Sequence, residues 1–413
     1  MTAVDAGMVI VGAGECGARA ALALREGGYQ GRVTLVGGEP HPPYERPPLS
    51  KDAMTGDDQP SPRVIASFEQ LADLRIAFLA GSPVTAIDRE ARSVVLADGR
   101  SLSYERLLLA TGSSPRRLAI APASPRIAYL RTFDDALALR EQMTPGRRVT
   151  IVGGGFIGLE LAASARRRGA EVTLIEAQER ILKRGVPEAV TEIVHKLHAG
   201  NGVEVVLGIA IVSVEADNAR VRIALADGRA IEADSTVIGI GAIPETGLAA
   251  AAGLAVDNGV AVDARLRSSD PDILAAGDCC SFPLAVYGGR RVRLEAWRNA
   301  QEQGLLAARN MLGAGENYAS VPWFWSDQYE MSLHIAGLAD EGVTTVRRDL
   351  GNGAFVLFHL ADDGRLVAAS GIGPGNSVAR EVRLAEMLIA RRAMPDRARL
   401  ALSDYRLKSL LAA

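Results

Sequence analysis

Cysteine is scarce in this sequence. Its 413 residues include three cysteines, Cys16, Cys279 and Cys280, which are too few for a disulfide framework. A bond between the adjacent Cys279 and Cys280 would close a small strained ring, so we expect both to be free thiols and Cys16 to be a small packing residue. The scarcity excludes the class of small secreted proteins that disulfides hold together.

Strong net charge and long apolar runs are missing too. The formal net charge is −3, which gives no basic footprint for nucleic acid. No apolar run approaches the roughly 18 residues that cross a bilayer, and residues 1–7 lack the basic and apolar pattern of a secretory signal. We therefore expect no nucleic-acid partner, no membrane partner and a cytoplasmic location.

Metal-ligand spacing is absent among the five histidines. His195 and His198 lie three residues apart, and we expect them on a helix surface rather than at a metal ion. With 48% apolar and 23% charged residues, the composition is that of an ordinary globular protein, and the length predicts two or three domains.

The sequence does contain an internal repeat. Val9–Gly17 and Thr150–Gly158 each hold a β-branched run and G-x-G-x-x-G, and a helical stretch rich in alanine and leucine follows each. Downstream of each copy, Leu96–Arg100 and Leu225–Arg229 share the sequence Leu-Ala-Asp-Gly-Arg, in which Asp-Gly signals a tight turn between strands. Each copy is therefore predicted to be a βαβ unit, an antiparallel meander and a closing strand.

The repeat predicts the fold class and the domains. We expect an α/β protein with two Rossmann-like dinucleotide-binding domains, arranged as in glutathione reductase, and a C-terminal α+β domain. The first dinucleotide domain takes residues 1–113 and 242–321, the second takes 114–241, and the C-terminal domain takes 322–413. Four strands and a helix are expected in the last domain, at Met331–Ala336, Val343–Arg347, Phe355–His359, Leu366–Ser370 and Val378–Arg392.

Two glycine-rich loops predict two dinucleotide sites. In each loop the first glycine permits the turn, the second lets a pyrophosphate approach the backbone, and the third lets the helix pack against the strand. The N-terminus of the helix then attracts the phosphates. The glycines concerned are Gly12, Gly14 and Gly17 in the first loop and Gly153, Gly155 and Gly158 in the second.

An acidic residue after the second strand of each copy indicates which nucleotide binds. Glu176 ends that strand in the second copy, where a carboxylate accepts hydrogen bonds from a ribose 2′-OH and repels a 2′-phosphate. NADH is therefore favoured over NADPH. Arg180 argues for NADPH, unless it is a solvated surface charge. In the first copy, Glu39 is the nearest acid for a ribose.

Five further segments carry a resemblance to a known family. Together with the two loops, they resemble the FAD-dependent NADH:ferredoxin reductases of bacterial cytochrome P450 and aromatic-ring dioxygenase systems, over nearly the whole chain. The resemblance implies a flavoprotein that passes electrons from NADH through FAD to a small [2Fe–2S] ferredoxin. Rubredoxin reductase and a redox-sensing flavoprotein like apoptosis-inducing factor are the alternatives. The segments are Pro43–Lys51, Leu108–Gly112, Ile273–Asp278, Glu295–Gln301 and Pro322–Tyr329.

The resemblance also implies site residues. Lys51 would lie near the isoalloxazine ring, and Glu160 would be a gate that meets the nicotinamide and pairs with Lys51. These two are the predicted positioning and electrostatic pair, the nearest to catalytic residues in a site where the cofactor does the chemistry. Further FAD or NADH contacts are expected from the glycines of both loops and from Glu39, Arg46, Thr111, Gly112, Glu176, Gly241, Gly277, Asp278, Trp297 and Trp325.

Each implied role has a simpler alternative. Lys51 is then an exposed lysine at a helix start, Glu160 favours the helix dipole, and Asp278 is a helix cap. Trp297 and Trp325 are then only core anchors.

The chain lacks the pair of cysteines through which disulfide reductases pass electrons on. Disulfide reductases of this architecture carry C-x-x-x-x-C just after the second strand, where this chain has Tyr44–Lys51. Electrons therefore do not leave through a thiol, and a ferredoxin is the expected acceptor. Because ferredoxins are usually acidic, an arginine-bearing docking rim is expected. The candidates are Arg290, Arg291, Arg293 and Arg309.

Overall fold

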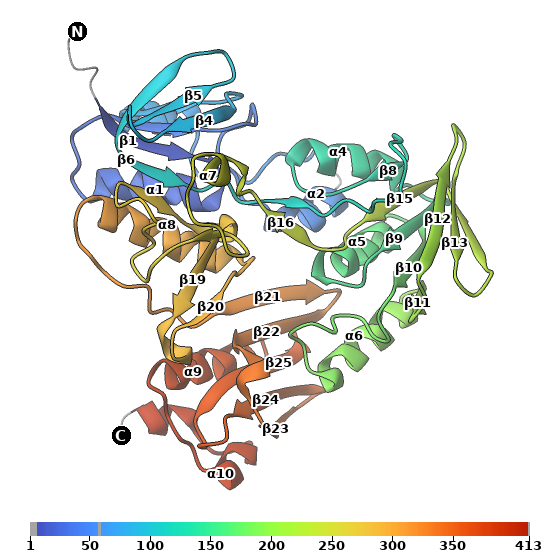
Figure 1. Ribbon diagram of the computed structural model, residues 1–413. Helices are drawn as coiled ribbons and strands as arrows, with labels where there is room; N and C mark the ends of the chain where they lie inside the picture. Colours follow the sequence, from blue (N-terminus) through green and yellow to red (C-terminus); the bar gives the residue numbers. More distant parts are fainter. Residues whose placement is uncertain (1–5, 57–58, 412–413) are drawn as a thin grey trace. The chain divides into compact units, whose positions relative to one another are not determined.

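The computed structural model describes residues 6–56 and 59–411, which divide into two compact units (Figure 1). Unit 1 consists of residues 6–46, 62–114 and 243–320. Unit 2 consists of residues 47–56, 59–61, 115–242 and 321–411.

Unit 1 is built on a sheet in the order β3-β2-β1-β6-β5-β4, with β18 also paired to β6. The strands β1, β2, β3, β6 and β18 run parallel, and β4 and β5 form the antiparallel part with β6. The helices α1 and α8 pack against each other. The bounds are β1 (Gly7–Val11), α1 (Glu15–Glu26), β2 (Val33–Val36), β3 (Ile76–Leu79), β4 (Val84–Asp88), β5 (Ser93–Leu96), β6 (Ser101–Leu109), β18 (Ile273–Ala275) and α8 (Trp297–Met311).

Unit 2 contains a second sheet of the same design, in the order β11-β10-β9-β15-β8. Its strands run parallel, and a separate meander, β12-β13-β14, lies between β11 and β15 in the chain. The bounds are β8 (Ile127–Ala128), α4 (Phe133–Gln142), β9 (Arg148–Val152), α5 (Phe156–Arg167), β10 (Glu171–Glu176), α6 (Glu188–Gly200), β11 (Val203–Leu207), β12 (Ile211–Ala216), β13 (Val221–Leu225), β14 (Ala230–Ala233) and β15 (Ser235–Ile238). The predicted duplication is therefore present in the fold.

The two predicted Asp-Gly turns are also equivalent. Leu96 N–H donates to the carbonyl of Arg100 at 2.8 Å, and Leu225 N–H donates to that of Arg229 at 2.9 Å. The glycine between them has φ 84° in the first turn and φ 88° in the second, which is the conformation that favours glycine at this point of a tight hairpin.

The C-terminal part of unit 2 is a five-stranded antiparallel sheet in the order β21-β22-β25-β24-β23, with α9 packed on it (Figure 1). Its four predicted strands and its predicted helix are confirmed. The aromatic-rich segment before them adds an edge strand that the pattern did not predict. The bounds are β21 (Trp323–Gln328), β22 (Met331–Gly337), β23 (Thr344–Gly351), β24 (Ala354–Leu360), β25 (Leu366–Pro374), α9 (Ala379–Ala390) and α10 (Arg397–Ala401).

Short elements complete both units. They are η1 (Pro47–Ser50), α2 (Asp52–Thr55), α3 (Phe68–Asp73), β7 (Ser113–Pro115), β16 (Ala242–Pro244), α7 (Gly247–Ala251), β17 (Val260–Ala261), η2 (Gly277–Cys279), β19 (Cys280–Leu284), η3 (Ala285–Tyr287), β20 (Arg290–Val292), η4 (Ala339–Glu341) and η5 (Leu407–Leu411). In residues 6–56 and 59–411, no helix combines the length and the apolar character needed to cross a membrane.

The two units divide the chain differently from the three predicted domains, because unit 2 contains both the second dinucleotide domain and the C-terminal domain. Residues 47–56 and 59–61, which were expected in the first dinucleotide domain, also belong to unit 2. The end of the short helix α2 leaves carbonyls without partners inside the helix. Arg140 and Arg168 each donate to the carbonyl of Met54, at 3.0 and 3.1 Å, and Ser164 Oγ donates to the carbonyl of Ser50 at 2.7 Å. These long-range bonds hold the segment to α4 and α5, and no local pattern reveals them.

Candidate functional site

The first glycine loop joins β1 to α1 in unit 1. Gly12 has φ 110°, and a Cβ there would lie 2.1 Å from the carbonyl oxygen of Ala110. A Cβ on Gly17 would lie 1.8 Å from the carbonyl oxygen of Gly12, so the helix packs too closely for any side chain. Gly14, at the N-terminus of α1, has no atom within 4 Å of its Cβ position. The N-terminus of α1 is therefore open and carries a partial positive charge, which fits a pyrophosphate.

The second loop joins β9 to α5 in unit 2 and repeats this geometry. A Cβ on Gly153 would lie 2.3 Å from the carbonyl oxygen of Gly239, and one on Gly158 would lie 2.1 Å from that of Gly153. Gly155 again faces open space. The residues of both loops therefore fit a dinucleotide, and their binding roles stay predictions.

Glu176 lies at the carboxyl end of β10, beside the second loop. Its Oε2 accepts from Gly154 N–H at 2.7 Å, and its Oε1 accepts from Gln178 N–H at 2.8 Å. Each carboxylate oxygen keeps a lone pair for a further donor. Arg180 is partly exposed, and its guanidinium donates to the carbonyls of Val186 and Lys183, at 3.1 and 3.2 Å.

Glu39 lies after β2 in unit 1 and is already paired. Its Oε2 accepts from Tyr44 Oη at 2.5 Å, and its Oε1 lies 2.6 Å from Nη2 of Arg46. Burial opposes the charge of Arg46, but the neighbouring Tyr44 and Glu39 outweigh burial and raise its pKa. The ribose role of Glu39 stays a prediction, and Tyr44 is a partner that the sequence did not indicate.

Asp278 lies in η2, directly after β18. Its Oδ2 accepts from Ser113 Oγ at 3.2 Å, and Asp278 is not a cap residue of the short helix, whose N-cap is Ala276 and whose C-cap is Cys280. Gly277 before it has φ 80°. The fully buried Gln303 accepts from Gly277 N–H at 2.7 Å and thereby holds the turn, a role that sequence reasoning missed.

The other residues predicted around the cofactors lie at loop and helix ends. Thr111 Oγ1 donates to the carbonyl of Glu245 at 2.7 Å, so its hydroxyl has a structural partner. Gly112 and Gly241 have positive φ values of 73° and 107°. Trp297 is the first residue of α8. Their cofactor contacts stay predictions.

A cluster of charged and aromatic side chains surrounds Lys51 in unit 2. Lys51 Nζ lies 3.4 Å from Oε1 of Glu160 and 3.2 Å from Oδ2 of Asp327. It also lies 5.7 Å from the ring centroid of Trp325, which stacks on Trp323. The structure therefore brings Lys51, Glu160 and Trp325 together. The Lys51 side chain is 21% exposed, so it is not a freely solvated lysine. Asp327 is a further member that sequence reasoning missed.

Glu160 is nearly enclosed, with 8% of its surface exposed. It lies beyond the first turn of α5, which contains no acid, so the helix dipole does not explain it. Ser50 Oγ donates to its Oε2 and Ser326 Oγ to its Oε1, each at 2.6 Å. Burial raises the pKa of Glu160, and the charge of Lys51 together with these hydroxyls opposes that rise.

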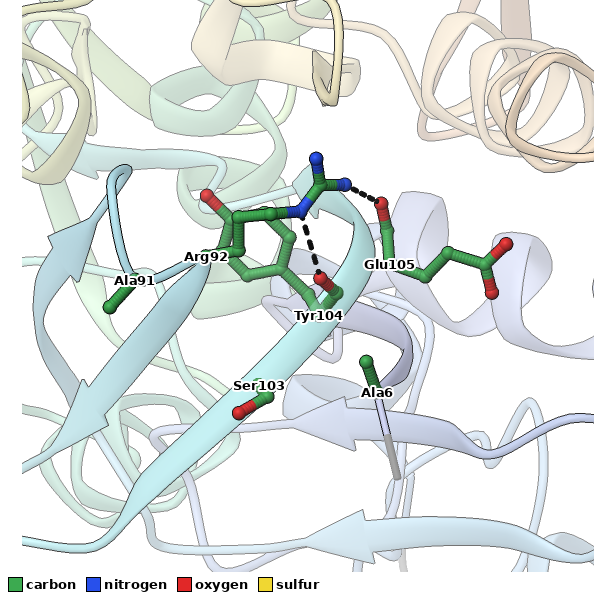
Figure 2. Close-up of a pocket in the computed structure, with 6 residues that line it drawn as sticks. All are labelled: Ala6, Ala91, Arg92, Ser103, Tyr104 and Glu105. Atoms are coloured by element: carbon green, nitrogen blue, oxygen red, sulfur yellow. Dashed lines mark hydrogen bonds between the residues drawn. The ribbon is translucent and has the colours of Figure 1, made fainter. Parts of the chain in front are cut away.

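A surface hollow of unit 1 lies away from the first glycine loop (Figure 2). Arg92 donates to the carbonyl oxygens of Tyr104 and Glu105 there. The hollow adjoins the residue before β1 and the first half of β6, whereas sheets of this kind bind nucleotides at the carboxyl ends of their strands. We therefore do not assign it to a cofactor. It is lined by Ala6, Ala91, Arg92, Ser103, Tyr104 and Glu105.

The predicted surface position of His198 is wrong. It lies on α6 but is fully buried, because Val190, Val194 and His198 form the inner face of that helix. Over the parts of the chain that the structure describes, no group of three or more His, Cys, Asp or Glu side chains could hold a metal ion. The three cysteines are free and buried, as expected.

The arginines predicted for a docking rim are mostly engaged. Arg291 donates to the carbonyls of Ser281 and Val262, at 2.6 and 3.1 Å, which is a structural role. Arg309 pairs with Glu316 at 2.9 Å. The docking rim stays a prediction for all four arginines.

Comparison with known proteins agrees with this geometry. Residues 7–304 match the family model described as pyridine nucleotide-disulphide oxidoreductase, and residues 323–411 match the model described as reductase C-terminal. The chain is 43% identical over 407 residues to the ferredoxin–NAD(+) reductase component of an anthranilate 1,2-dioxygenase system from Burkholderia cepacia, with 98% of each chain covered.

Two further matches cover most of the chain. Rhodocoxin reductase from Rhodococcus erythropolis is 40% identical over 354 residues, which is 85% of this chain and 83% of that protein. Among solved structures, putidaredoxin reductase in its covalent complex with putidaredoxin superposes with a TM-score of 0.92, at 34% identity and 99% coverage of both chains. The predicted family and fold class are confirmed: the chain belongs to the pyridine nucleotide-disulphide oxidoreductase family, among the ferredoxin reductases that carry a reductase C-terminal domain.

Proposed function

We propose that this protein is an NADH:ferredoxin reductase, the electron-transfer component of a P450 or ring-hydroxylating oxygenase system. Residues 1–113 and 242–321 bind FAD, residues 114–241 bind NADH, and residues 322–413 form the C-terminal domain. The observation that carries the proposal is the pair of glycine loops with matching geometry, in a chain whose relatives are ferredoxin reductases. FAD, when bound, accepts a hydride and releases electrons one at a time.

The chain's own residues bind and orient. The backbone at Gly14 and the N-terminus of α1 hold one pyrophosphate, and the equivalent groups at Gly155 and α5 hold the other. Glu176 accepts from the ribose of NADH and disfavours the 2′-phosphate of NADPH. Glu160, on the helix that follows the second loop, and its partner Lys51 present a fixed charge pair to the nicotinamide.

Thiol chemistry is not part of the proposal. Burial raises the pKa of each cysteine thiol, Cys16, Cys279 and Cys280, so the thiols stay protonated and are poor nucleophiles. None of them lies in the segment after β2. The acceptor is therefore a separate one-electron carrier, a [2Fe–2S] ferredoxin. Free thiols and the use of NADH support a cytoplasmic location.

The test uses the purified protein under anaerobic conditions. NADH is expected to bleach the flavin, and cytochrome c reduction is expected to be fast only when a [2Fe–2S] ferredoxin is added. Turnover with rubredoxin but not with ferredoxin would assign the alternative acceptor. Slow reoxidation with a lasting charge-transfer band would assign a redox sensor instead. A colourless protein that binds no FAD would overturn the proposal.

A further inference from the structure

A buried chain of hydrogen bonds runs from Glu160 into the interior of unit 2. Ser326 Oγ lies 2.6 Å from Glu160 Oε1, and Gln328 Nε2 lies 2.9 Å from Ser326 Oγ. His198 Nε2 lies 2.9 Å from Gln328 Oε1. Ser326, Gln328 and His198 are each at most 1% exposed. The chain crosses from α5 through β21 to α6 (Figure 1), and none of its inner members is explained by cofactor binding.

The chain has two possible directions. In the first, His198 Nε2–H donates to Gln328, the Gln328 amide donates to Ser326, and the Ser326 hydroxyl donates to Glu160. Every donor then points toward a charged carboxylate. In the second, all three bonds reverse, so Glu160 must carry a proton to donate to Ser326 and His198 must carry its proton on Nδ1. The direction of the chain and the charge of Glu160 are therefore coupled.

The surroundings of His198 decide between the two directions. Among the described residues its Nδ1 has no hydrogen-bond partner. A buried N–H without an acceptor is costly, so the tautomer with the proton on Nδ1 is disfavoured. Burial also lowers the pKa of His198 to about 4, so the ring is neutral near pH 7 and has one proton to place. That proton belongs on Nε2, which selects the first direction.

We infer that His198 and Gln328 are positioning residues for Glu160: they fix the Ser326 hydroxyl as a donor to the Glu160 carboxylate and so keep it charged beside Lys51. The part of this inference that concerns hydride transfer rests on the proposed function. The part that concerns the charge of Glu160 does not.

Other charged and titratable groups face this carboxylate or its neighbours. Lys51 favours the charged form directly. Asp327, on β21, shares Lys51 with Glu160 and competes for its charge. His334, on β22, interacts electrostatically with Asp327. Lys51 and Ser50 remain in the Gln328 and His198 variants described below. Any change in the titration of Glu160 in those variants is therefore due to the hydrogen-bond chain and not to these two neighbours.

The direct test is an infrared pH titration of the FAD-loaded protein. The carboxyl band of Glu160 is assigned by its loss in Glu160→Gln. Gln328→Met and His198→Phe each remove a group that orients the Ser326 hydroxyl, and losing this aligned donor is expected to move the titration midpoint of Glu160 upward by about one pH unit. His198→Gln keeps a donor at this position and is expected to move the midpoint less than His198→Phe does.

His359 provides the matched control. It is also a buried histidine of unit 2, 4% exposed, with its pKa lowered to about 4 by burial, but it bonds Ser370 at 3.1 Å and has no part in the chain. His359→Phe is expected to leave the Glu160 midpoint in place. An equal shift of the Glu160 midpoint in this control would overturn the inference. So would an unchanged Glu160 midpoint in both Gln328→Met and His198→Phe.

Two further readouts separate this inference from the proposed function. Nitrogen NMR of the wild-type protein is expected to show His198 protonated on Nε2; a proton on Nδ1 overturns the inference even if no variant folds. The acid limb of the rate of flavin reduction by NADH is expected to shift with the infrared midpoint. If the midpoint shifts but NADH does not reduce the flavin, the inference stands and the proposed function fails.

Discussion

Glu176 offers the sharpest test of coenzyme choice. Glu176→Arg removes a carboxylate acceptor from the mouth of the second loop. A hydrogen bond to a charged acceptor contributes about 1.5–3 kcal/mol, so the loss of one bond to the ribose lowers NADH affinity by roughly 10-fold to 150-fold. The side chain is only partly buried. The attraction between the new arginine and a 2′-phosphate is therefore expected to contribute about 1 kcal/mol, the value for two charges in contact with water. The preference for NADH should fall by about two orders of magnitude.

The structure also predicts a cost within the loop. Gly154 N–H and Gln178 N–H lose the carboxylate that accepts from both of them. Gln178 is exposed and water can replace the acceptor, whereas Gly154 is buried. We therefore expect loss of NADH binding to dominate over gain of NADPH binding. Glu176→Gln keeps an acceptor oxygen without the charge, and its preference should lie between those of the wild type and the arginine variant.

Stopped-flow reduction of the flavin, with NADH and NADPH each varied, measures the two affinities separately from the rate of hydride transfer. Glu171→Arg is the matched control, because Glu171 is an exposed glutamate at the other end of β10. It should leave both affinities unchanged. An unchanged NADH-to-NADPH ratio in Glu176→Arg, with normal FAD content and melting temperature, would remove Glu176 from coenzyme selection.

Three other predictions follow from single contacts. Gly17→Ala should prevent FAD retention because its Cβ would lie 1.8 Å from a carbonyl oxygen. Gly14→Ala should fold normally because its Cβ meets no atom within 4 Å. Equal melting temperatures of the two variants would contradict this prediction. Lys51→Met removes the cation beside Glu160, so the carboxyl pKa should rise and flavin reduction near neutral pH should slow; a pH profile that matches the wild type would exclude the pair from the reaction. Burial lowers the pKa of His359 to about 4 in the folded protein, whereas its pKa in the unfolded chain is about 6.5. As the pH falls, the unfolded state therefore binds a proton first. The free energy of unfolding is expected to fall between pH 6.5 and pH 4, by up to about 3 kcal/mol. His359→Phe should flatten that fall in thermal unfolding, and an equally steep fall would rule the histidine out as its source.

Local chemistry made much of the fold predictable. The strand Val33–Val36 is buried along its whole length, as a β-branched run in a covered parallel sheet requires. The turns at Asp98 and Asp227 follow from Asp-Gly between alternating strands. The glycines of both loops occupy positions where a side chain does not fit or where a ligand needs room. In each case a short segment contains the whole physical reason for its structure.

The surroundings of Glu160 were not predictable in this way. Ser50 lies 110 residues from Glu160 in the sequence and Ser326 lies 166 residues from it. No pattern in either segment indicates that its serine binds a carboxylate. His198 did carry a signal, since it continues the apolar series of Val190 and Val194 at helical spacing. A histidine on such a face must find a polar partner inside the fold, but only the fold identifies it as Gln328.

The two loops share a glycine framework but differ in what holds their acidic residue. Glu176 accepts a hydrogen bond from the backbone of its own loop at Gly154, so its carboxylate is held in a fixed position beside the second loop. Glu39 instead pairs with Arg46 and accepts from Tyr44, so most of its charge is balanced inside the protein. A negative, fixed acceptor discriminates between ribose and ribose phosphate, and a balanced one does not. Discrimination is useful only where two coenzymes compete for one site, and this difference supports the proposal that NADH binds at the second loop and FAD at the first.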